Sequence, residues 1–342
     1  MIGNGHECNW YAVTMDWALV MAGFVLLMTG GEVVVQGAVV IAKRMRVPPL
    51  LIGFTIVAIG TSLPELAGSL EAVAGNQPDL AVGGVLGSNV ANVMLVLGTA
   101  SMLGAANDPG KGVRRDAKAM MFASFLLLGA VYLGEISIYF GALMLVSLIG
   151  YYAYSYFNTK EEDSEIEDSW VPDNIAIATL VTAIGGVLIW KGADLLIEGA
   201  TGIATSMGIS EAIVGLSVIA LGTSLPELAV TIVAGLRGQG GVAVGNVLGS
   251  NMMNILGILG VTALVGGGVP VNPGFAERDI WVMLLTSGLV AAMLLDDREI
   301  GRRTGFSMVA GYFLYMAYPV SYTHLRAHET LRYLVCRLLL EK

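Results

Sequence analysis

The sequence predicts an all-α polytopic membrane protein with ten transmembrane helices, arranged as two inverted five-helix repeats with broken helices at the membrane midplane. Three observations support this fold class. Of the 342 residues, 55% are hydrophobic and only 13% are charged, whereas soluble domains carry about 25% charged residues. Ten apolar stretches approach or exceed the length of about 20 residues that crosses a bilayer. A hexapeptide, Gly60–Glu65, recurs unchanged as Gly222–Glu227.

The ten apolar stretches fall into two sets of five. They lie near residues 17–41, 50–75, 80–103, 119–136 and 138–157, and again near 174–200, 209–236, 242–266, 279–296 and 303–320. The sets define a first repeat over 17–157 and a second repeat over 174–320. The acidic segment 158–173 between them is expected to be a solvated cytoplasmic linker, because charge runs usually are. A regulatory cation-binding role for this linker is the alternative.

The two sets are related by an internal duplication. At a fixed offset of 162, residues 53–98 match 215–260 at 23 of 46 positions without a gap. A shared membrane composition would not keep polar residues in step over such a length. Because each half has an odd number of spans, the second copy must enter the membrane from the opposite side, as in inverted-repeat transporters.

The placement of Lys and Arg predicts the orientation of the chain. With the N-terminus outside, the outer loops hold only Arg278, and the inner loops hold nearly all other loop cations, as the positive-inside rule requires. These inner residues are Lys43, Arg44, Arg46, Lys111, Arg114, Arg115, Lys118, Lys160, Arg237, Arg298, Arg302 and Arg303. The acidic linker is therefore expected in the cytoplasm and both termini outside.

The remaining composition excludes several classes. The net charge of −9 comes largely from the linker and gives no reason to expect a nucleic-acid partner. Cys8 and Cys336 form no CxxC motif, so neither a disulfide framework nor a zinc site is supported. Residues 321–342 hold two of the three histidines on the predicted outer face. We set this stretch aside as a suspected non-native tail; a short extramembrane helix is the alternative.

The repeated hexapeptide predicts a broken helix with a buried acid in each half. Pro64 and Pro226 each remove a helical hydrogen bond and clash with the carbonyl four residues earlier, and they disfavour helical geometry just before them. The chain is therefore expected to unwind and to free carbonyls from about Ala58 and Ala220 onward. A carboxylate inside an apolar span costs roughly 2.5–3.5 kcal/mol, so it indicates a functional site by default. A neutral, hydrogen-bonded carboxyl is the alternative.

The next span in each half adds hydroxyl and amide groups. Gly87-Ser88-Asn89 with Asn92 is matched by Gly249-Ser250-Asn251 with Asn254. Ser88 and Asn92 are four residues apart and share one helix face. Such residues can simply join packed membrane helices, but in register with the acidic motif they favour ion coordination. Carbonyls, hydroxyls and carboxylates form an oxygen-only ligand set that suits calcium and sodium.

These paired motifs, GTSLPE followed by GSN-x-x-N, resemble those of the sodium/calcium exchanger family, of the prokaryotic type in the cation/calcium exchanger superfamily. The resemblance spans about residues 17–320. It implies that calcium is bound by Glu65, Glu227, Thr61 and Thr223 and by the carbonyls of Ala58 and Ala220. It implies sodium sites lined by Ser62, Ser224, Ser88, Ser250, Asn92 and Asn254. It also implies a multi-pass protein of the prokaryotic inner membrane.

The expected function is secondary active antiport of sodium against calcium by alternating access, with no enzymatic activity and no cofactor. The partners would be the two transported ions and the lipid bilayer. Two carboxylates give the empty site a charge of about −2 that only bound cations relieve. A calcium/proton exchanger of the same superfamily is the first alternative, and a passive cation channel is the second.

Overall fold

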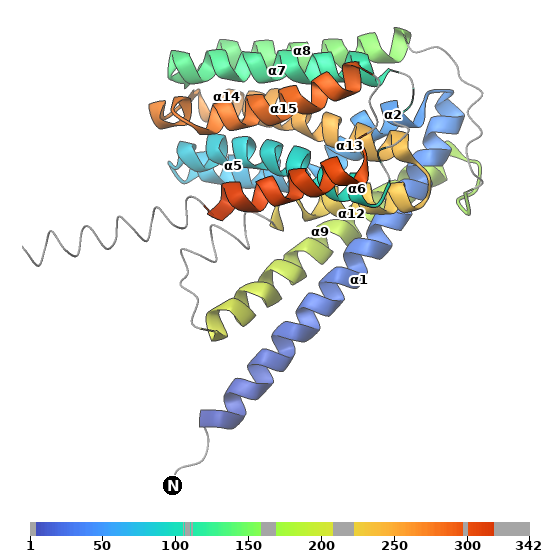
Figure 1. Ribbon diagram of the computed structural model, residues 1–342, viewed down its shortest axis with the longest axis vertical. Coiled ribbons are helices and arrows are strands. Elements are labelled where there is room, and N and C mark those ends of the chain that lie inside the picture. Colours follow the sequence, from blue (N-terminus) through green and yellow to red (C-terminus); the bar gives the residue numbers. More distant parts are fainter. Residues whose placement is uncertain are drawn as a thin grey trace, which may run out of the picture.

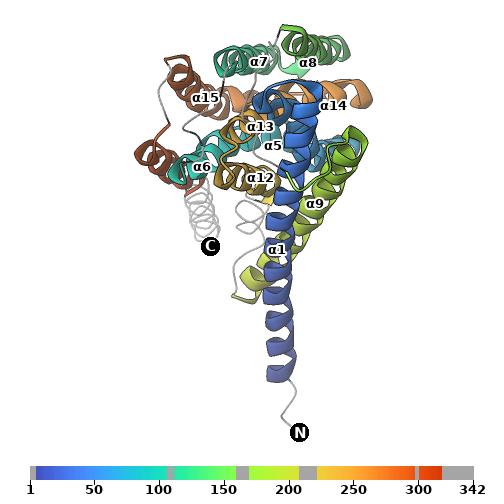
Figure 2. The ribbon, with the colours of Figure 1, turned by 90° about the vertical axis from the view of Figure 1, so that its right-hand side faces the viewer.

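Two long helices lie side by side and project from a bundle formed by the other helices. The computed structural model describes residues 5–104, 106, 110, 112–158, 169–207, 222–296 and 300–317. Helix α1 (Gly5–Met45) and helix α9 (Ile175–Ser206) are the two long helices. Both views show them crossing the bundle at one end and extending beyond it at the other (Figures 1 and 2).

The bundle contains the rest of the described elements. In chain order these are α2 (Pro49–Ile52), η1 (Gly53–Val57), α3 (Ala58–Thr61), α4 (Leu63–Ala74), α5 (Pro78–Ala91), η2 (Asn92–Leu97), α6 (Gly98–Met102), α7 (Val113–Leu133), β1 (Glu135–Ile136), α8 (Ile138–Asn158), α12 (Leu225–Leu236), α13 (Gly240–Met252), η4 (Met253–Ile258), α14 (Leu259–Gly266), β2 (Val269–Pro270), η5 (Pro273–Ala276) and α15 (Asp279–Leu295). A further helix covers residues 302–317.

Four glycines of helices α1 and α9 contact one another in pairs, so the two backbones touch. A Cβ atom on Gly23 would lie 2.6 Å from the carbonyl oxygen of Gly192, and one on Gly30 would lie 2.9 Å from that of Gly185. Residue numbers increase along α1 as they decrease along α9 from one contact to the next, so the two helices are antiparallel. Small residues allow such close approach of membrane helices. We call these four residues the glycine seam.

Helix α13 lies at the centre of the bundle, and every residue from Val242 to Met252 is buried. It packs directly on the first half of the chain. A Cβ on Gly245 would overlap the carbonyl oxygen of Leu50, and one on Gly249 would overlap that of Phe54. The backbone of α13 is therefore pressed against α2 and η1.

The predicted helix break is present in the first repeat. Residues Pro49–Thr61 and Leu63–Ala74 form two segments bent by 43°. Ser62 between them has φ −88° and ψ 5°, outside helical geometry, and Ser224 in the second copy has nearly the same angles, −91° and 3°. The break is narrower than expected, because the amide of Ser62 still donates to the Ala58 carbonyl (3.1 Å).

Every apolar stretch expected from the sequence contains helix where the structure describes it. Over these residues, seven helices are long and apolar enough to cross a membrane, or eight if the bent pair counts as one span. In two further predicted spans, the described helices Leu225–Leu236 and 302–317 are shorter than the length needed to cross a membrane. Part of the predicted stretch 209–236 lies outside the described residues. Most of the acidic linker and all of 321–342 also lie outside them. The count of ten spans and the domain limits stay predictions.

A short strand pair and two ion pairs join segments that are far apart in the sequence. Strands β1 and β2 pair antiparallel, so the α7–α8 and α14–α15 turns meet at one end. Arg44 donates to the carboxylate of Asp173 at 2.6 Å, and Arg237 pairs with Glu32 at 2.8 Å.

Candidate functional site

The two repeated acids meet inside the bundle. Glu65 lies in the first turn of α4 and Glu227 in the first turn of α12, each one turn after its helix break. Their side chains are close enough to interact electrostatically. Glu65 is 9% exposed and Glu227 is fully buried. A helix N-terminus favours a carboxylate, but two neighbouring buried carboxylates repel each other and would be stabilised by a bound cation.

The break in the first repeat supplies hydroxyls to the acid of the second. The Ser62 hydroxyl donates to Glu227 Oε1 at 3.2 Å. The hydroxyls of Thr61 and Ser250 also neighbour this carboxylate. Thr61 Oγ1 lies 3.4 Å from Ser250 Oγ and 3.3 Å from the Ala58 carbonyl oxygen. This cluster of polar groups is therefore shared between the two halves.

Asn246 is a central residue that the sequence analysis missed. Its Oδ1 accepts from Thr61 at 3.3 Å, and its Nδ2 donates to Thr231 Oγ1 at 3.0 Å and to the Glu227 carbonyl at 3.3 Å. It connects both broken helices. Matching the two repeats does not identify Asn246, because Gly84 stands at the equivalent position in the first repeat. Its spacing four residues before Ser250, on the same helix face, could have revealed it.

Asn92 and Asn254 occupy equivalent places where the helix widens. Asn92 begins η2, and Asn254 is the second residue of η4; both elements are π-helical turns, a feature frequent at functional sites. Both side chains are completely buried. Neither amide has a hydrogen-bond partner among the residues that the structure describes. Buried polar groups are normally paired, so these amides fit a place that ions or water occupy.

The other predicted ligands are placed as follows. Ser88 and Ser224 are buried, and within the described part of the chain Ser224 Oγ and both Glu65 oxygens have no partner. Thr223 is partly exposed and lies beside a cavity of about 550 Å³ that Glu65 and Ser88 also line. Ala220 lies outside the described residues. Thr61, Ser62 and Ser250 therefore gather around Glu227, and Ser88 and Thr223 share a cavity with Glu65. Such oxygen-rich surroundings suit hard cations.

The asparagines of the two GSN triplets, Asn89 and Asn251, have a packing role instead. Asn89 donates to the Val85 carbonyl of its own helix at 2.7 Å. Asn251 lies 3.5 Å from the Asn89 carbonyl and 3.7 Å from the Met120 sulfur. These contacts join α13 to α5 and α7 behind the site.

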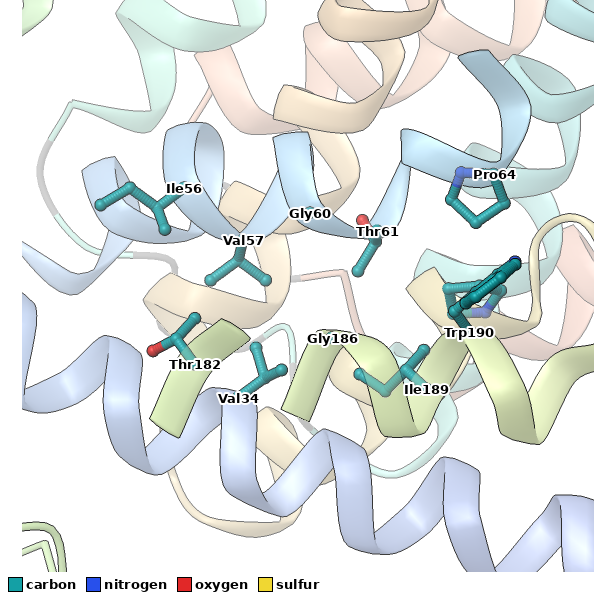
Figure 3. A pocket seen from close by; sticks show the side chains of 11 residues that line it. Val34, Ile56, Val57, Gly60, Thr61, Pro64, Thr182, Gly186, Ile189 and Trp190 are labelled. Carbon is teal, nitrogen blue, oxygen red and sulfur yellow. The ribbon is translucent and has the colours of Figure 1, made fainter. Parts of the chain in front are cut away.

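An apolar surface separates the site from the two long helices. A small pocket of about 30 Å³ lies between the broken helix and the α1–α9 pair. Val57 and Pro64 line it from the broken helix, and Val34, Ile189 and Trp190 from the long helices (Figure 3). Thr61 instead makes polar contacts with α13, at Asn246 and Ser250, so its hydroxyl faces the bundle centre.

Comparison with known proteins places most of this chain in one family. The family model for the sodium/calcium exchanger protein matches residues 15–157 and 177–320. Inner membrane protein YrbG of Escherichia coli is 34% identical over 282 residues, covering 79% of this chain and 86% of YrbG. Sodium/calcium exchanger MaX1 of Methanosarcina acetivorans is 31% identical, covering 80% of this chain and 90% of MaX1.

A solved structure is similar over nearly the whole chain. The sodium-calcium exchanger NCX_Mj, soaked with 10 mM Na⁺ and 10 mM Sr²⁺, superposes with a TM-score of 0.76 at 29% sequence identity. The match covers 89% of this chain and 98% of that chain. Together with the paired acidic motifs and the family match on both halves, this establishes that the chain belongs to the sodium/calcium exchanger family of membrane antiporters.

Proposed function

We propose that this protein exchanges sodium for calcium across the membrane by alternating access. The observation that carries the proposal is the meeting of Glu65 and Glu227 in one buried, oxygen-lined site. Ser62 and Thr61 from one half reach the acid of the other half. One calcium ion or several sodium ions can neutralise the two carboxylates, but the shared ligands prevent both sets from binding together.

The ligand roles follow the chemistry of the side chains. Calcium would be held by Glu65 and Glu227, by the hydroxyls of Thr61 and Thr223, and by backbone carbonyls. The carbonyls proposed are those of Ala58 and Ala220. Since the Ala58 carbonyl already accepts the Ser62 amide, only its second lone pair is available to an ion.

Sodium would use the flanking hydroxyls and amides. The proposed ligands are Ser62, Ser224, Ser88, Ser250, Asn92 and Asn254. The two asparagine amides are completely buried and have no hydrogen-bond partner among the described residues. This supports the assignment, because the neutral oxygen of an amide can coordinate a sodium ion.

Inverted topology would make the site reachable from either side in turn. The antiparallel contact of α1 and α9, which occupy equivalent positions at the offset of 162, supports the inversion. We therefore retain ten spans, with the N-terminus outside the cytoplasmic membrane. Net charge moving in each cycle would couple exchange to the membrane potential, at about 2.3 kcal/mol per charge per 100 mV.

The test is sodium-driven calcium uptake into proteoliposomes by Glu65→Gln and Glu227→Gln. Each substitution removes one charge while keeping the shape, so we expect nearly complete loss of exchange. Glu71→Gln is the matched control, because Glu71 lies on the same helix α4 but is exposed and has no counterpart in the second repeat. Transport retained by either site variant, with the control unchanged, would refute the assignment.

The coupling ion needs a separate measurement. Calcium uptake driven by a sodium gradient at equal pH is compared with uptake driven by a pH gradient without sodium. The hydroxyl and amide groups around the acids favour sodium over protons as the coupling ion, since a proton binds to a carboxylate without further oxygen ligands. Uptake on the pH gradient alone would instead favour the calcium/proton exchanger, and flux without any counter-ion would favour a channel.

A further inference from the structure

A large groove lies between α7 and α8, away from the ion site. Its volume is about 820 Å³. Its floor is formed by Met252 and Leu256, which belong to the same continuous helix as Ser250 and Asn254. The lining residues used below are Arg114, Lys118, Phe122, Gly150, Tyr151 and Tyr154.

One end of the groove is basic. Arg114 and Lys118 lie one helical turn apart at the start of α7, and both are exposed. Arg115 between them pairs with the buried carboxylate of Asp116 at 2.9 Å, and Tyr151 donates to the same carboxylate at 2.5 Å. These bonds fix the start of α7 against α8, so the cationic rim is held in place.

The rest of the groove is mostly apolar, with Ser147 and two tyrosines also lining it. Phe122, one turn beyond Lys118, is 57% exposed. Gly150 leaves open space, because a Cβ added there would meet no atom within 4 Å. Tyr154 lies near the end of α8, at the same end as the basic rim, where a tyrosine suits a membrane interface. The groove thus changes from charged to apolar along α7.

We propose that this groove binds one anionic glycerophospholipid, with its phosphate at Arg114 and Lys118 and an acyl chain along the exposed Phe122 and over Gly150, above the buried floor. Basic pockets between membrane helices on the cytoplasmic side bind anionic headgroups. A free phosphate would leave the apolar surface uncovered. The acidic run at 161–168 could match the charge, but it carries almost no apolar side chains to fill the groove.

The experiment measures lipid binding to the full-length protein in detergent by native mass spectrometry. The probes are phosphatidylglycerol, phosphatidylcholine with the same acyl chains, and glycerol phosphate. We expect one tightly bound phosphatidylglycerol per chain, bound at least about tenfold more tightly than phosphatidylcholine, which corresponds to about 1.4 kcal/mol. Glycerol phosphate should neither bind stably nor compete at equal concentration.

Two variants separate the headgroup from the acyl chain. Arg114→Glu with Lys118→Glu reverses the rim charge, and Gly150→Phe fills the groove without changing any charge. Each should weaken phosphatidylglycerol binding at least about tenfold. Arg302→Glu with Arg303→Glu is the charge-matched control on another helix and should leave binding within about twofold, since separated surface charges are screened.

Several outcomes would overturn the proposal. They are equal binding of the two lipids, equal loss in the control variant, or competition by glycerol phosphate. Normal binding by Gly150→Phe would also overturn it, because the acyl chain would then lie elsewhere. The melting temperature of each variant is measured without lipid and compared with that of the parent protein. If Arg114→Glu with Lys118→Glu is misfolded by this measure, lipid binding by Gly150→Phe decides whether the groove is the binding site.

Discussion

Asn246 offers the sharpest test of how the site is assembled, because its side chain joins residues from both halves. Asn246→Ala removes the acceptor of Thr61 and the donor to Thr231 and to the Glu227 carbonyl. Thr61 can turn to the Ala58 carbonyl, but the other two groups are left buried. A net hydrogen bond is worth about 1 kcal/mol, so we expect a loss of about 2 kcal/mol.

Part of this loss should appear in calcium binding, since Thr61 and Glu227 are proposed ligands. We expect the calcium concentration for half-maximal exchange to rise about tenfold, equivalent to about 1.4 kcal/mol, and the melting temperature to fall. Calcium uptake into proteoliposomes over a range of calcium concentrations measures the first quantity. Differential scanning fluorimetry measures the second.

Asn251→Ala is the matched control for this prediction. Asn251 lies on the same helix and is equally buried, but its contacts are long and point away from the acids. We expect a lower melting temperature with nearly unchanged calcium dependence. If Asn246→Ala keeps calcium dependence within about twofold of the parent protein, a change below about 0.5 kcal/mol, the bridging role is refuted.

Three further predictions concern packing, sodium and calcium. Gly249→Ala should strongly reduce the yield of monodisperse protein, because its methyl group would overlap the backbone of Phe54, whereas Gly129→Ala meets no neighbour and should be neutral; size-exclusion chromatography compares them. Ser62→Ala removes the hydroxyl of a proposed sodium ligand that contacts Glu227, so the sodium concentration needed for exchange should rise at least about tenfold, equivalent to about 1.4 kcal/mol. Calcium at about 100 times its Kd should stabilise the folded protein by about 2.7 kcal/mol, and a Glu227→Gln variant whose melting temperature still rises fully with calcium would contradict the proposed site.

The sequence predicted the helical segments and the helix break well, because both depend on local chemistry. Apolar length sets the spans. Pro64 has no N–H to donate to the Gly60 carbonyl, so the helix is interrupted just before it. The break is nevertheless narrower than expected, since the Ser62 amide reaches the Ala58 carbonyl despite the bend. A local rule gives the position of a break, but the surrounding packing determines its width.

The site itself was only partly predictable. Residues present in both copies were easy to identify, whereas Asn246 is matched by Gly84 and was passed over. Nothing in the spacing of Ser62 indicated that its hydroxyl would reach Glu227, 165 positions away. Contacts between halves depend on how α12 and α13 pack against the first repeat, and a duplicated motif alone does not contain that information.

The glycine seam has a consequence for how such a chain could arise. Gly23 and Gly185 are equivalent at the offset of 162, as are Gly30 and Gly192, yet Gly23 contacts Gly192 and Gly30 contacts Gly185. Helix α1 therefore uses the same surface to contact α9 as α9 uses to contact α1. Two-fold isologous interfaces have this property. An ancestral polypeptide of half this length would already have carried both faces of the contact and could have assembled as a homodimer before gene fusion joined its two copies.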